Sequence, residues 1–334
     1  MTMTKTFKIA IVGCGTISTN HLNAVKALEN VKVVALCDVK RERAEAAAGK
    51  FELDAAIYTD YAEMLAKEEL DSVHICTPHY LHAPMTIAAL EKNINVFLEK
   101  PMCISVDDIT RMIEAEKKSD ARVCVCFQNR FTSAVMKAKE LADLDGGARS
   151  AHFSLFWQRN EKYYTESGWR GSYKTEGGGV MINQAIHSLD LLTLFLGEPE
   201  SITATTANHH LNGIIEVEDS CEGLLKFKSG ATANFYATTS SSGRDYTSIY
   251  VSTRNHSIEI RLPDLIVDGS FVECEKEILP TGKECYGDGH VKLIKMFYDS
   301  LLNNTSMPVT LESAQYAVRI LLCAYKSNDR ETII

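Results

Sequence analysis

The feature that most constrains this chain is a glycine-rich turn set between an apolar run and a helical stretch near the N-terminus. The apolar run is Ile9–Val12, the turn is Gly13–Ser18, and the helical stretch is His21–Leu28. Short apolar runs bounded by turn residues are typical of strands that are buried on both faces. The order strand, glycine turn, helix is that of the first unit of a parallel sheet wrapped by helices.

Each residue of the turn has a physical use if a dinucleotide binds there. Gly13 permits the tight turn, and Gly15 lets the backbone come close to a pyrophosphate. The free N–H groups at the start of the following helix then face the phosphates, beside Thr16 and Ile17. The third glycine of the usual fingerprint is replaced by Ser18, which is small enough for close packing. We therefore predict a dinucleotide cofactor at this turn.

An acidic residue at the end of the second predicted strand bears on which cofactor binds. Asp38 follows the apolar run Val31–Cys37 and lies 20 residues after Ser18 (38 − 18), where a carboxylate meets the adenosine ribose. Because a carboxylate repels a 2′-phosphate, Asp38 favours NAD. Lys40 and Arg41 follow directly, and their positive charges weaken the repulsion between Asp38 and a 2′-phosphate, so NADP stays possible. Asp38 also suits the N-cap of the helix that starts at Arg41.

The order of the predicted elements gives the fold class and two domains. With 334 residues, the chain exceeds the size at which a single core stops growing. In its first part strands alternate with helices such as Arg41–Phe51, which predicts an N-terminal Rossmann domain with a doubly wound parallel sheet. Later strands, such as Thr232–Thr238, have few helices between them, which predicts a C-terminal α/β domain with a large open, mostly antiparallel sheet. We expect a dinucleotide-binding domain over residues 1–127 and a substrate-binding and oligomerisation domain over residues 128–334.

Two further polar segments follow predicted strands of the first domain. Thr77, Pro78 and His79 come directly after the apolar run Val73–Cys76. Because open α/β sheets bind ligands beyond the carboxyl ends of their strands, these three residues should border the cofactor. His79 equally suits the cap of the next helix.

The segment Glu99–Pro101 follows the strand Ile94–Leu98 in the same way. Pro101 disfavours helical geometry at Lys100 and holds it extended. An ammonium near the nicotinamide can hydrogen-bond a substrate oxygen and stabilise developing alkoxide charge, and a nicotinamide cation would lower its pKa. Glu99 and Lys100 are therefore predicted at the cofactor, although Lys-Pro after a strand is more often a surface turn.

A second polar cluster lies on the predicted helix Val180–Leu196, which follows three glycines. Asn183 and His187 are four residues apart and share one helix face, and Asp190 lies three residues further on. A histidine there can take a hydroxyl proton as general base. The alternative is a helical histidine that is simply satisfied by Asp190. The preceding glycines indicate close approach of a ligand or of another backbone.

A segment rich in aromatic residues and arginine precedes that helix and holds both tryptophans of the chain. Aromatic faces suit sugar rings, and arginine suits a carboxylate or a phosphate. We expect substrate contacts from Trp157, Arg159, Tyr164, Trp169 and Arg170. A packed loop or a subunit interface explains the same residues equally well.

Taken in order, these motifs resemble those of the Gfo/Idh/MocA oxidoreductase family, and the resemblance runs from Lys8 to the final helix. It implies a Rossmann domain followed by an α/β domain with a large open sheet, and it implies that Lys100 and His187 flank the reacting carbon. In many members an Asp stands where this chain has Asn183, which cannot take a proton but can hydrogen-bond a sugar hydroxyl. The Asn-Gln form resembles the branch that acts on sugars and sugar-acid derivatives.

The expected activity is hydride transfer between a secondary alcohol of a sugar or polyol and NAD(P). In this hypothesis His187 removes the hydroxyl proton, Lys100 holds the oxygen, and Asn183 and Asp190 contribute to substrate binding. Two alternatives stay open. One is an NAD-dependent glycosidase that oxidises its sugar transiently, and the other is a non-catalytic regulator that keeps the nucleotide site as a sensor.

Composition narrows the partners and the compartment. The formal net charge of −9 argues against a nucleic-acid surface. No apolar leader follows Met1 and no apolar stretch is long enough for a membrane span, which predicts a cytoplasmic protein. The cysteines lie mostly inside apolar runs, which suits a reducing compartment, and none has zinc spacing, so no metal is expected. An open sheet face predicts a homodimer or homotetramer.

Overall fold

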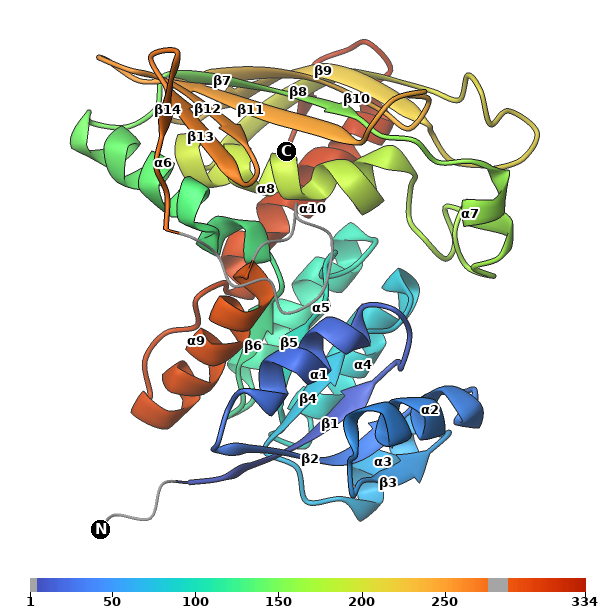
Figure 1. Cartoon of the computed structure of the whole chain (residues 1–334). Helices are drawn as coiled ribbons and strands as arrows, with labels where there is room; N and C mark the ends of the chain where they lie inside the picture. Colours follow the sequence, from blue (N-terminus) through green and yellow to red (C-terminus); the bar gives the residue numbers. More distant parts are fainter. Residues whose placement is uncertain (1–4, 276–287) are drawn as a thin grey trace.

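The computed structural model describes residues 5–275 and 288–334, and it consists of two sheet units stacked one above the other (Figure 1). The lower unit holds a six-stranded parallel sheet with helices around it. The upper unit holds a nine-stranded sheet whose helices lie on the side facing the first unit. The predicted fold class is confirmed.

The first sheet has the strand order β3-β2-β1-β4-β5-β6, and every neighbouring pair is parallel. Its strands are β1 Phe7–Val12, β2 Val31–Cys37, β3 Ala56–Tyr58, β4 Ser72–Ile75, β5 Asn95–Leu98 and β6 Val123–Val125. The central strands are buried and mostly apolar because helices cover both faces of the sheet, and β4 adds the buried polar side chains of Ser72 and His74. The order reverses between β1 and β4, which opens a crevice at the carboxyl ends of these two strands.

Five helices connect the strands of this sheet: α1 Ser18–Lys26, α2 Arg41–Phe51, α3 Tyr61–Lys67, α4 His82–Leu90 and α5 Val106–Lys117. Two of them begin at side-chain caps. The Asp60 carboxylate accepts the Glu63 N–H of α3 at 2.7 Å, and the Ser105 hydroxyl accepts the Asp108 N–H of α5 at 3.1 Å. Such caps satisfy backbone donors that the first helical turn leaves unpaired.

The second sheet has the order β14-β13-β12-β11-β7-β10-β9-β8-β15, and only the pair β7–β10 is parallel. Its strands are β7 Ser150–Phe156, β8 Pro199–Ala207, β9 Ser220–Phe227, β10 Thr232–Thr238, β11 Tyr246–Ser252, β12 Ser257–Arg261, β13 Asp264–Val267, β14 Ser270–Val272 and β15 Thr332–Ile333. One face packs on α6 Ser133–Leu144, α8 Ile186–Leu196 and α10 Leu311–Ser327, and the short helix α7 Glu161–Thr165 lies at the end of the sheet. The other face carries the exposed side chains of Phe156, Leu224 and Tyr236.

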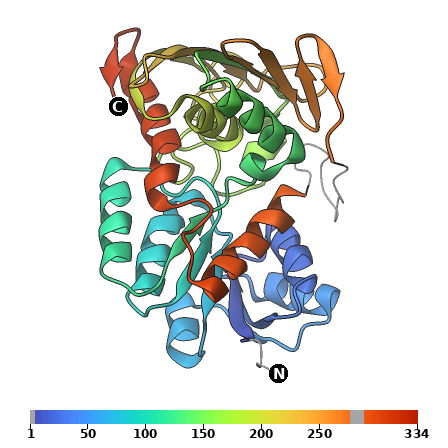
Figure 2. The same ribbon diagram turned by 90° about the vertical axis from the view of Figure 1, so that its left-hand side faces the viewer.

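One helix of the second half of the chain belongs spatially to the first sheet. Helix α9 Gly289–Asn303 packs against α1, as both ribbon views show (Figure 2). Its Tyr298 hydroxyl is buried and hydrogen-bonds His74 Nε2 at 2.7 Å and Ser72 Oγ at 3.1 Å on β4. A division of the chain at residue 127 therefore stays a prediction, and α9 crosses it.

Candidate active site

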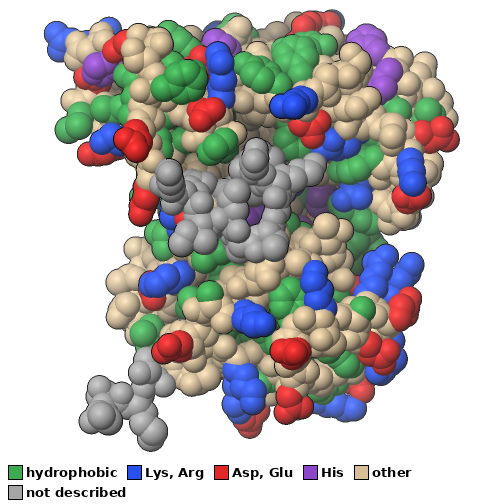
Figure 3. Space-filling model, viewed as in Figure 1, with side chains coloured by type: hydrophobic (Ala, Val, Ile, Leu, Met, Phe, Trp, Pro, Cys, Tyr) green, Lys and Arg blue, Asp and Glu red, His purple; other side chains and the backbone are tan. Residues whose placement is uncertain are grey.

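A cavity of about 1210 Å³ lies between the two sheet units, at the carboxyl ends of the strands of the first sheet. Histidine side chains are visible at this waist of the molecule in the space-filling view (Figure 3). From the first unit the predicted residues Gly13, Gly15, Thr16, Ile17, Asp38, Thr77, Pro78, His79, Glu99 and Lys100 line the cavity. From the second unit Trp157, Arg159, Trp169, Arg170, Asn183 and His187 line it. Residues far apart in sequence therefore share one cavity.

Gly13 and Gly15 of the first turn are glycines for different structural reasons. Gly13 has a φ of +87°, and a Cβ at this position would lie 2.6 Å from the Cys76 carbonyl oxygen. A Cβ at Gly15 would have no atom within 4 Å and would stand at the edge of the cavity. Gly13 is thus required by the fold, whereas the open space at Gly15 is where a ligand can approach the backbone. Ser18 Oγ donates to the Gly15 carbonyl oxygen at 2.6 Å and closes the turn.

The carboxylate of Asp38 is fixed at the edge of the cavity by two backbone donors. It accepts the Cys14 N–H at 2.8 Å and the Lys40 N–H at 2.9 Å. The alternative role as a cap of α2 is wrong, because the N-cap residue of α2 is Lys40 and no side chain caps this helix. The Asp38 contacts link the end of β2 to the glycine turn, so the carboxylate is held rigidly beside the cavity.

Glu99 lines the cavity and belongs to a buried cluster of polar side chains. Its Oε1 is 2.9 Å from His21 Nε2 and 3.6 Å from His290 Nε2. Burial alone would raise the pKa of Glu99, but these histidine contacts hold it well below its usual range. His21 Nδ1 in turn lies 2.9 Å from His74 Nδ1. A hydrogen-bonded chain thus runs from Glu99 through two histidines to Tyr298 of α9.

The same cluster has the donor set of a metal site. Donor atoms of His21, Glu99, Cys126 and His290 all lie within 4.8 Å of one another, and this nitrogen, sulfur and oxygen set suits zinc. The distance of 2.9 Å between His21 and Glu99 is nevertheless that of a direct hydrogen bond. The absence of a metal stays a prediction, which metal analysis of the purified protein tests.

Lys100 extends from the end of β5 across the cavity to the second unit. Its Nζ donates to the Asn183 carbonyl oxygen at 2.9 Å, and the peptide bond to Pro101 is cis. Burial lowers the pKa of the Lys100 ammonium, and the nearby Arg170 cation adds to this effect. The ammonium is therefore positioned by a backbone carbonyl of the helical segment that also carries the Asn183 and His187 side chains.

The helical segment behind these groups begins in a tightly packed glycine turn. A Cβ at Gly179 would meet the Glu218 carbonyl oxygen, and one at Gly178 would meet the Tyr325 hydroxyl. No side chain therefore fits at Gly179, because the backbone at Glu218 packs against it, or at Gly178, because the Tyr325 side chain does. The Glu218 carboxylate accepts the Gly179 N–H at 2.9 Å and the Met181 N–H at 3.0 Å, which satisfies donors at the start of the helix. Residues Met181–Ala185 form a π-helical turn before α8.

His187 lies in the first turn of α8 and faces the cavity. Burial lowers its pKa well below the usual range, and the Lys100 ammonium lowers it further. Among the described residues, its buried Nδ1 atom has no hydrogen-bond partner. The lowered pKa favours the neutral imidazole of His187, and Asp190 does not satisfy its Nδ1 atom.

Asn183, in the π-helical turn, is held by a carboxyl group that the sequence did not single out. Its Nδ2 donates to Glu176 Oε1, and Glu176 Oε2 accepts the Gly171 N–H at 2.6 Å. Glu176 is fully buried, and burial raises its pKa to about 7. Hydrogen bonds from Gly171 and Asn183 and the charge of Arg170 oppose that rise. A titratable carboxyl thus lies directly behind the Asn183 amide.

The arginines and aromatic residues of the second unit form a continuous stack along the cavity wall. The Arg159 guanidinium lies 4.7 Å from the Trp157 ring and 5.0 Å from the Tyr163 ring. The Arg170 guanidinium lies 4.5 Å from the same Tyr163 ring and 4.7 Å from the Trp169 ring. Arg159 also pairs with Asp245 at 3.3 Å. Cation–π stacking of this kind fixes the planar guanidinium groups.

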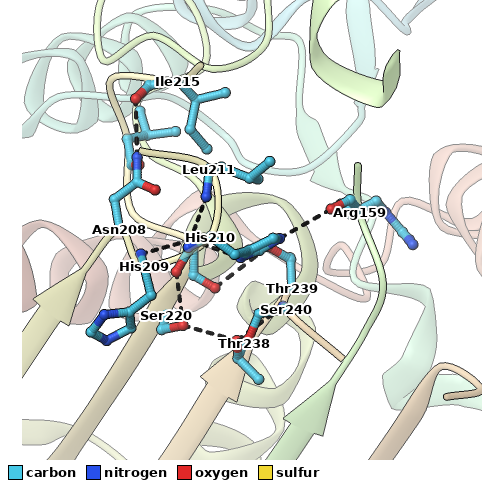
Figure 4. A network of polar contacts seen from close by, with 12 residues as sticks. Arg159, Asn208, His209, His210, Leu211, Ile215, Ser220, Thr238, Thr239 and Ser240 are labelled. Atoms are coloured by element: carbon cyan, nitrogen blue, oxygen red, sulfur yellow. Dashed lines mark hydrogen bonds and ion pairs between the residues drawn. The ribbon is translucent and has the colours of Figure 1, made fainter. Parts of the chain in front are cut away.

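A polar network supports the start of this stack from behind (Figure 4). The buried Asp219 carboxylate accepts the N–H groups of His209 and His210 at 2.8 Å each and that of Leu211 at 3.2 Å. The His210 ring reaches across to the Arg159 carbonyl oxygen, with Nε2 at 3.3 Å. Residues between β8 and β9 thereby hold the segment that carries Trp157 and Arg159.

Two predicted substrate residues do not line the cavity. Tyr164 is buried in a small apolar cluster with Leu211, Ile215 and Val217, and Tyr163 beside it takes the place in the stack. Asp190 is buried and paired with Arg130, whose Nε donates to Asp190 Oδ2 at 2.8 Å. The expectation of substrate contacts from Tyr164 and Asp190 is therefore corrected, because packing and an ion pair occupy these side chains.

Models of one protein family match both halves of the chain. The model of an oxidoreductase family with an NAD-binding Rossmann fold, Gfo/Idh/MocA, matches residues 7–127, and a C-terminal domain model of the same family matches residues 136–259. The chain belongs to the Gfo/Idh/MocA family.

Individual relatives are more distant. Inositol 2-dehydrogenase of Salmonella typhimurium is 36% identical over 140 residues, which are 41% of this chain and 42% of the relative. D-apiose dehydrogenase of Paraburkholderia graminis is 30% identical over 70% of this chain and 60% of the relative. These matches thus span about half of the relatives' own length. The solved WlbA dehydrogenase of Chromobacterium violaceum, in complex with NADH and UDP-GlcNAcA, is 26% identical with a TM-score of 0.82, covering 100% of this chain and 97% of that chain.

The cavity of this Gfo/Idh/MocA protein fits NAD at its first-unit end. The open space at Gly15 faces the first turn of α1, where backbone N–H groups favour phosphate. Asp38 has the carboxylate that a ribose diol requires. Among the described residues no helix is long and apolar enough to cross a membrane. Glu176 and Glu218 are the site residues that sequence reasoning missed, and only the position of Glu176 directly before the three glycines offered a signal.

Proposed function

We propose that this protein catalyses hydride transfer between a secondary alcohol of a sugar, sugar derivative or polyol and NAD. The observation that carries the proposal is the pairing of a neutral histidine, His187, with a lysine, Lys100, in one cavity that also holds the dinucleotide-binding turn. A relative such as inositol 2-dehydrogenase, named for a polyol substrate, supports this substrate class. NAD, when bound, supplies a nicotinamide that accepts a hydride.

The residues of the chain perform the proton part of the reaction. His187 accepts the hydroxyl proton, because burial keeps its imidazole neutral and its partner-free Nδ1 leaves it unengaged by the described protein groups. Lys100 holds the substrate oxygen and stabilises the charge that develops there. Asn183 hydrogen-bonds a neighbouring hydroxyl.

Substrate contacts are proposed for the stacked wall of the second unit. Trp157 and Trp169 offer flat apolar faces to a sugar ring, and Arg159 and Arg170 offer donors to its oxygens or to an acidic group.

The test combines cofactor titration with a substrate screen. We expect NADH to bind more tightly than NADPH by calorimetry, and one sugar or polyol to give NADH absorbance. Replacing Lys100 with Met should keep NADH affinity and lower kcat by about a hundredfold to ten-thousandfold. Full activity of Lys100→Met would refute the assignment. Cleavage of a glycoside without net absorbance change would instead support the NAD-dependent glycosidase, and binding without turnover would support the regulator.

We further propose that the protein is a cytoplasmic homo-oligomer. The exposed face of the second sheet carries Phe156 and Tyr236, whose rings lie 5.5 Å apart, together with exposed Leu224 and Tyr246. Such an apolar face is typical of a surface that a partner subunit covers. Free thiols at the described cysteines other than Cys274 suit a reducing compartment. Light scattering at micromolar concentration should give a dimer or a tetramer, and a monomer would contradict the proposal.

A further inference from the structure

The Asn183 amide lies between the cavity and a buried carboxyl group. Its Nδ2 is engaged by Glu176, so Oδ1 is the amide atom left for a ligand, and no hydrogen bond between described residues ends on that oxygen. An Asn side chain can turn over without changing its shape, which exchanges the acceptor for the donors. Its orientation is therefore set by the group behind it.

We propose that Glu176 controls which end of the Asn183 amide faces the cavity, and that proton uptake by Glu176 reverses this orientation. The proposal deepens the dehydrogenase function and rests on it for the identity of the ligand, a substrate hydroxyl. Glu176 acts as a positioning residue, since it touches Asn183 and the Gly171 N–H and does not line the cavity.

The hydrogen-bond inventory gives the direction of the switch. When Glu176 is ionised, its two oxygens accept from the Gly171 N–H and from Asn183 Nδ2, and Asn183 Oδ1 can accept a substrate hydroxyl. When Glu176 is protonated, Oε2 still accepts from Gly171, so the proton lies on Oε1. Two donors would then face each other, which is unfavourable in a buried site. Turning the amide removes the conflict, because Oδ1 accepts the new O–H and Nδ2 faces the cavity.

The groups around Glu176 raise its pKa, so that its carboxyl gains or loses a proton near neutral pH. Glu176 is 0% exposed, and its pKa is raised to about 7, with burial as the main cause. Arg170 and Lys100 face it with positive charge and favour the ionised form. The acidic Glu218 and the hydroxyl of Tyr164 lie on its other sides, and His79 donates to its backbone carbonyl oxygen.

The variant Glu176→Gln imitates the protonated state. Gln has one oxygen, which the Gly171 N–H requires, so its NH₂ group faces Asn183 and needs Oδ1 opposite it. In the wild type we expect the KM of the alcohol substrate to rise about tenfold as the pH falls through about 7, the effect of losing one hydrogen bond. In Glu176→Gln the KM should stay at the high value and lose this pH dependence. The Glu116→Gln variant is the control, because the half-buried Glu116 also has a pKa of about 7 but accepts the Val123 N–H, and its pH dependence of KM should match the wild type.

A second measurement does not depend on turnover. In protein labelled with nitrogen-15 asparagine, the side-chain amide signal of Asn183 is assigned by its loss in Asn183→Ala. It should shift as the pH passes through about 7 in the wild type, and it should keep one position in Glu176→Gln. If the signal titrates but no alcohol reduces NAD, the proposed function fails and the switch stands. If the signal does not titrate, or if Glu176→Gln keeps the wild-type pH dependence of KM, the switch is wrong even when the enzyme is an active dehydrogenase.

Discussion

At the residue scale, the two glycines of the first turn separate what the fold needs from what the cofactor needs. Gly13 combines a positive φ of +87° with a neighbouring carbonyl oxygen 2.6 Å from the position of a Cβ. Gly15 has neither constraint. The same residue type therefore serves stability at one position and ligand approach at the other.

The matched variants Gly13→Ala and Gly15→Ala test this separation. Gly13→Ala forces strain and a backbone clash, so we expect a loss of about 2–4 kcal/mol in the free energy of unfolding. Gly15→Ala should leave Tm unchanged and weaken NADH binding at least about tenfold, because the added methyl group stands where the pyrophosphate approaches. Thermal unfolding and calorimetric titration of both variants give the answer. Equal Tm values for the two variants would contradict the interpretation of Gly13.

At the scale of elements, long periodic segments could be predicted from sequence and short ones could not. Helix α2 Arg41–Phe51 and strand β10 Thr232–Thr238 have the predicted bounds, because their patterns repeat over several turns or residue pairs. Strand β15 Thr332–Ile333 has two residues and exists only through pairing with β8. The single predicted helix Val180–Leu196 is a π-helical turn followed by α8, a local change that no periodicity indicates.

The same limit applies to the candidate site. Residues after strands, such as Lys100, follow from the rule that the carboxyl ends of parallel strands meet at one edge. The roles of Glu176 and Glu218 depend instead on burial and on backbone donors brought from elsewhere in the chain. Asp190 looks like a partner of His187 by helical spacing, yet it pairs with Arg130 because a buried carboxylate takes the cation that the neighbouring segment offers. Tertiary partners of this kind are not encoded in local spacing.

The support of the arginine and aromatic stack gives a prediction at the element scale. Although burial would raise the pKa of Asp219, hydrogen bonds from His209, His210 and other donors hold it low, so this carboxylate is ionised. Asp219→Ala leaves these backbone donors unsatisfied and releases His210 from its place beside Arg159. We expect a higher KM for the alcohol substrate, unchanged NADH affinity, and faster hydrogen exchange over residues 157–159 and 208–211. Unchanged exchange in both segments would show that the network does not hold the stack.

At the scale of the whole molecule, buried titratable groups set how stability depends on pH. Burial lowers the pKa of His21, His74, His79, His82 and His187, so below pH 6.5 the unfolded chain binds protons that the folded chain does not. Stability from these groups therefore falls as the pH falls through 6.5. The carboxyl of Glu218 acts in the opposite direction. Burial raises its pKa from 4.5 to about 7, so between these values the folded chain holds the additional proton, and this contribution is lost as the pH rises.

The variant Glu218→Gln isolates the carboxyl contribution. It loses one backbone acceptor, so it should be less stable than the wild type near pH 4.5, where the Glu218 carboxyl of the wild type is protonated. Because it cannot bind the additional proton, its free energy of unfolding should rise with pH more steeply than that of the wild type, by about 1.4 kcal/mol per pH unit between pH 4.5 and about 7. Urea unfolding over a pH series measures both slopes. Parallel curves would mean that Glu218 is ionised in the folded protein throughout this range, and that its backbone donors outweigh its burial.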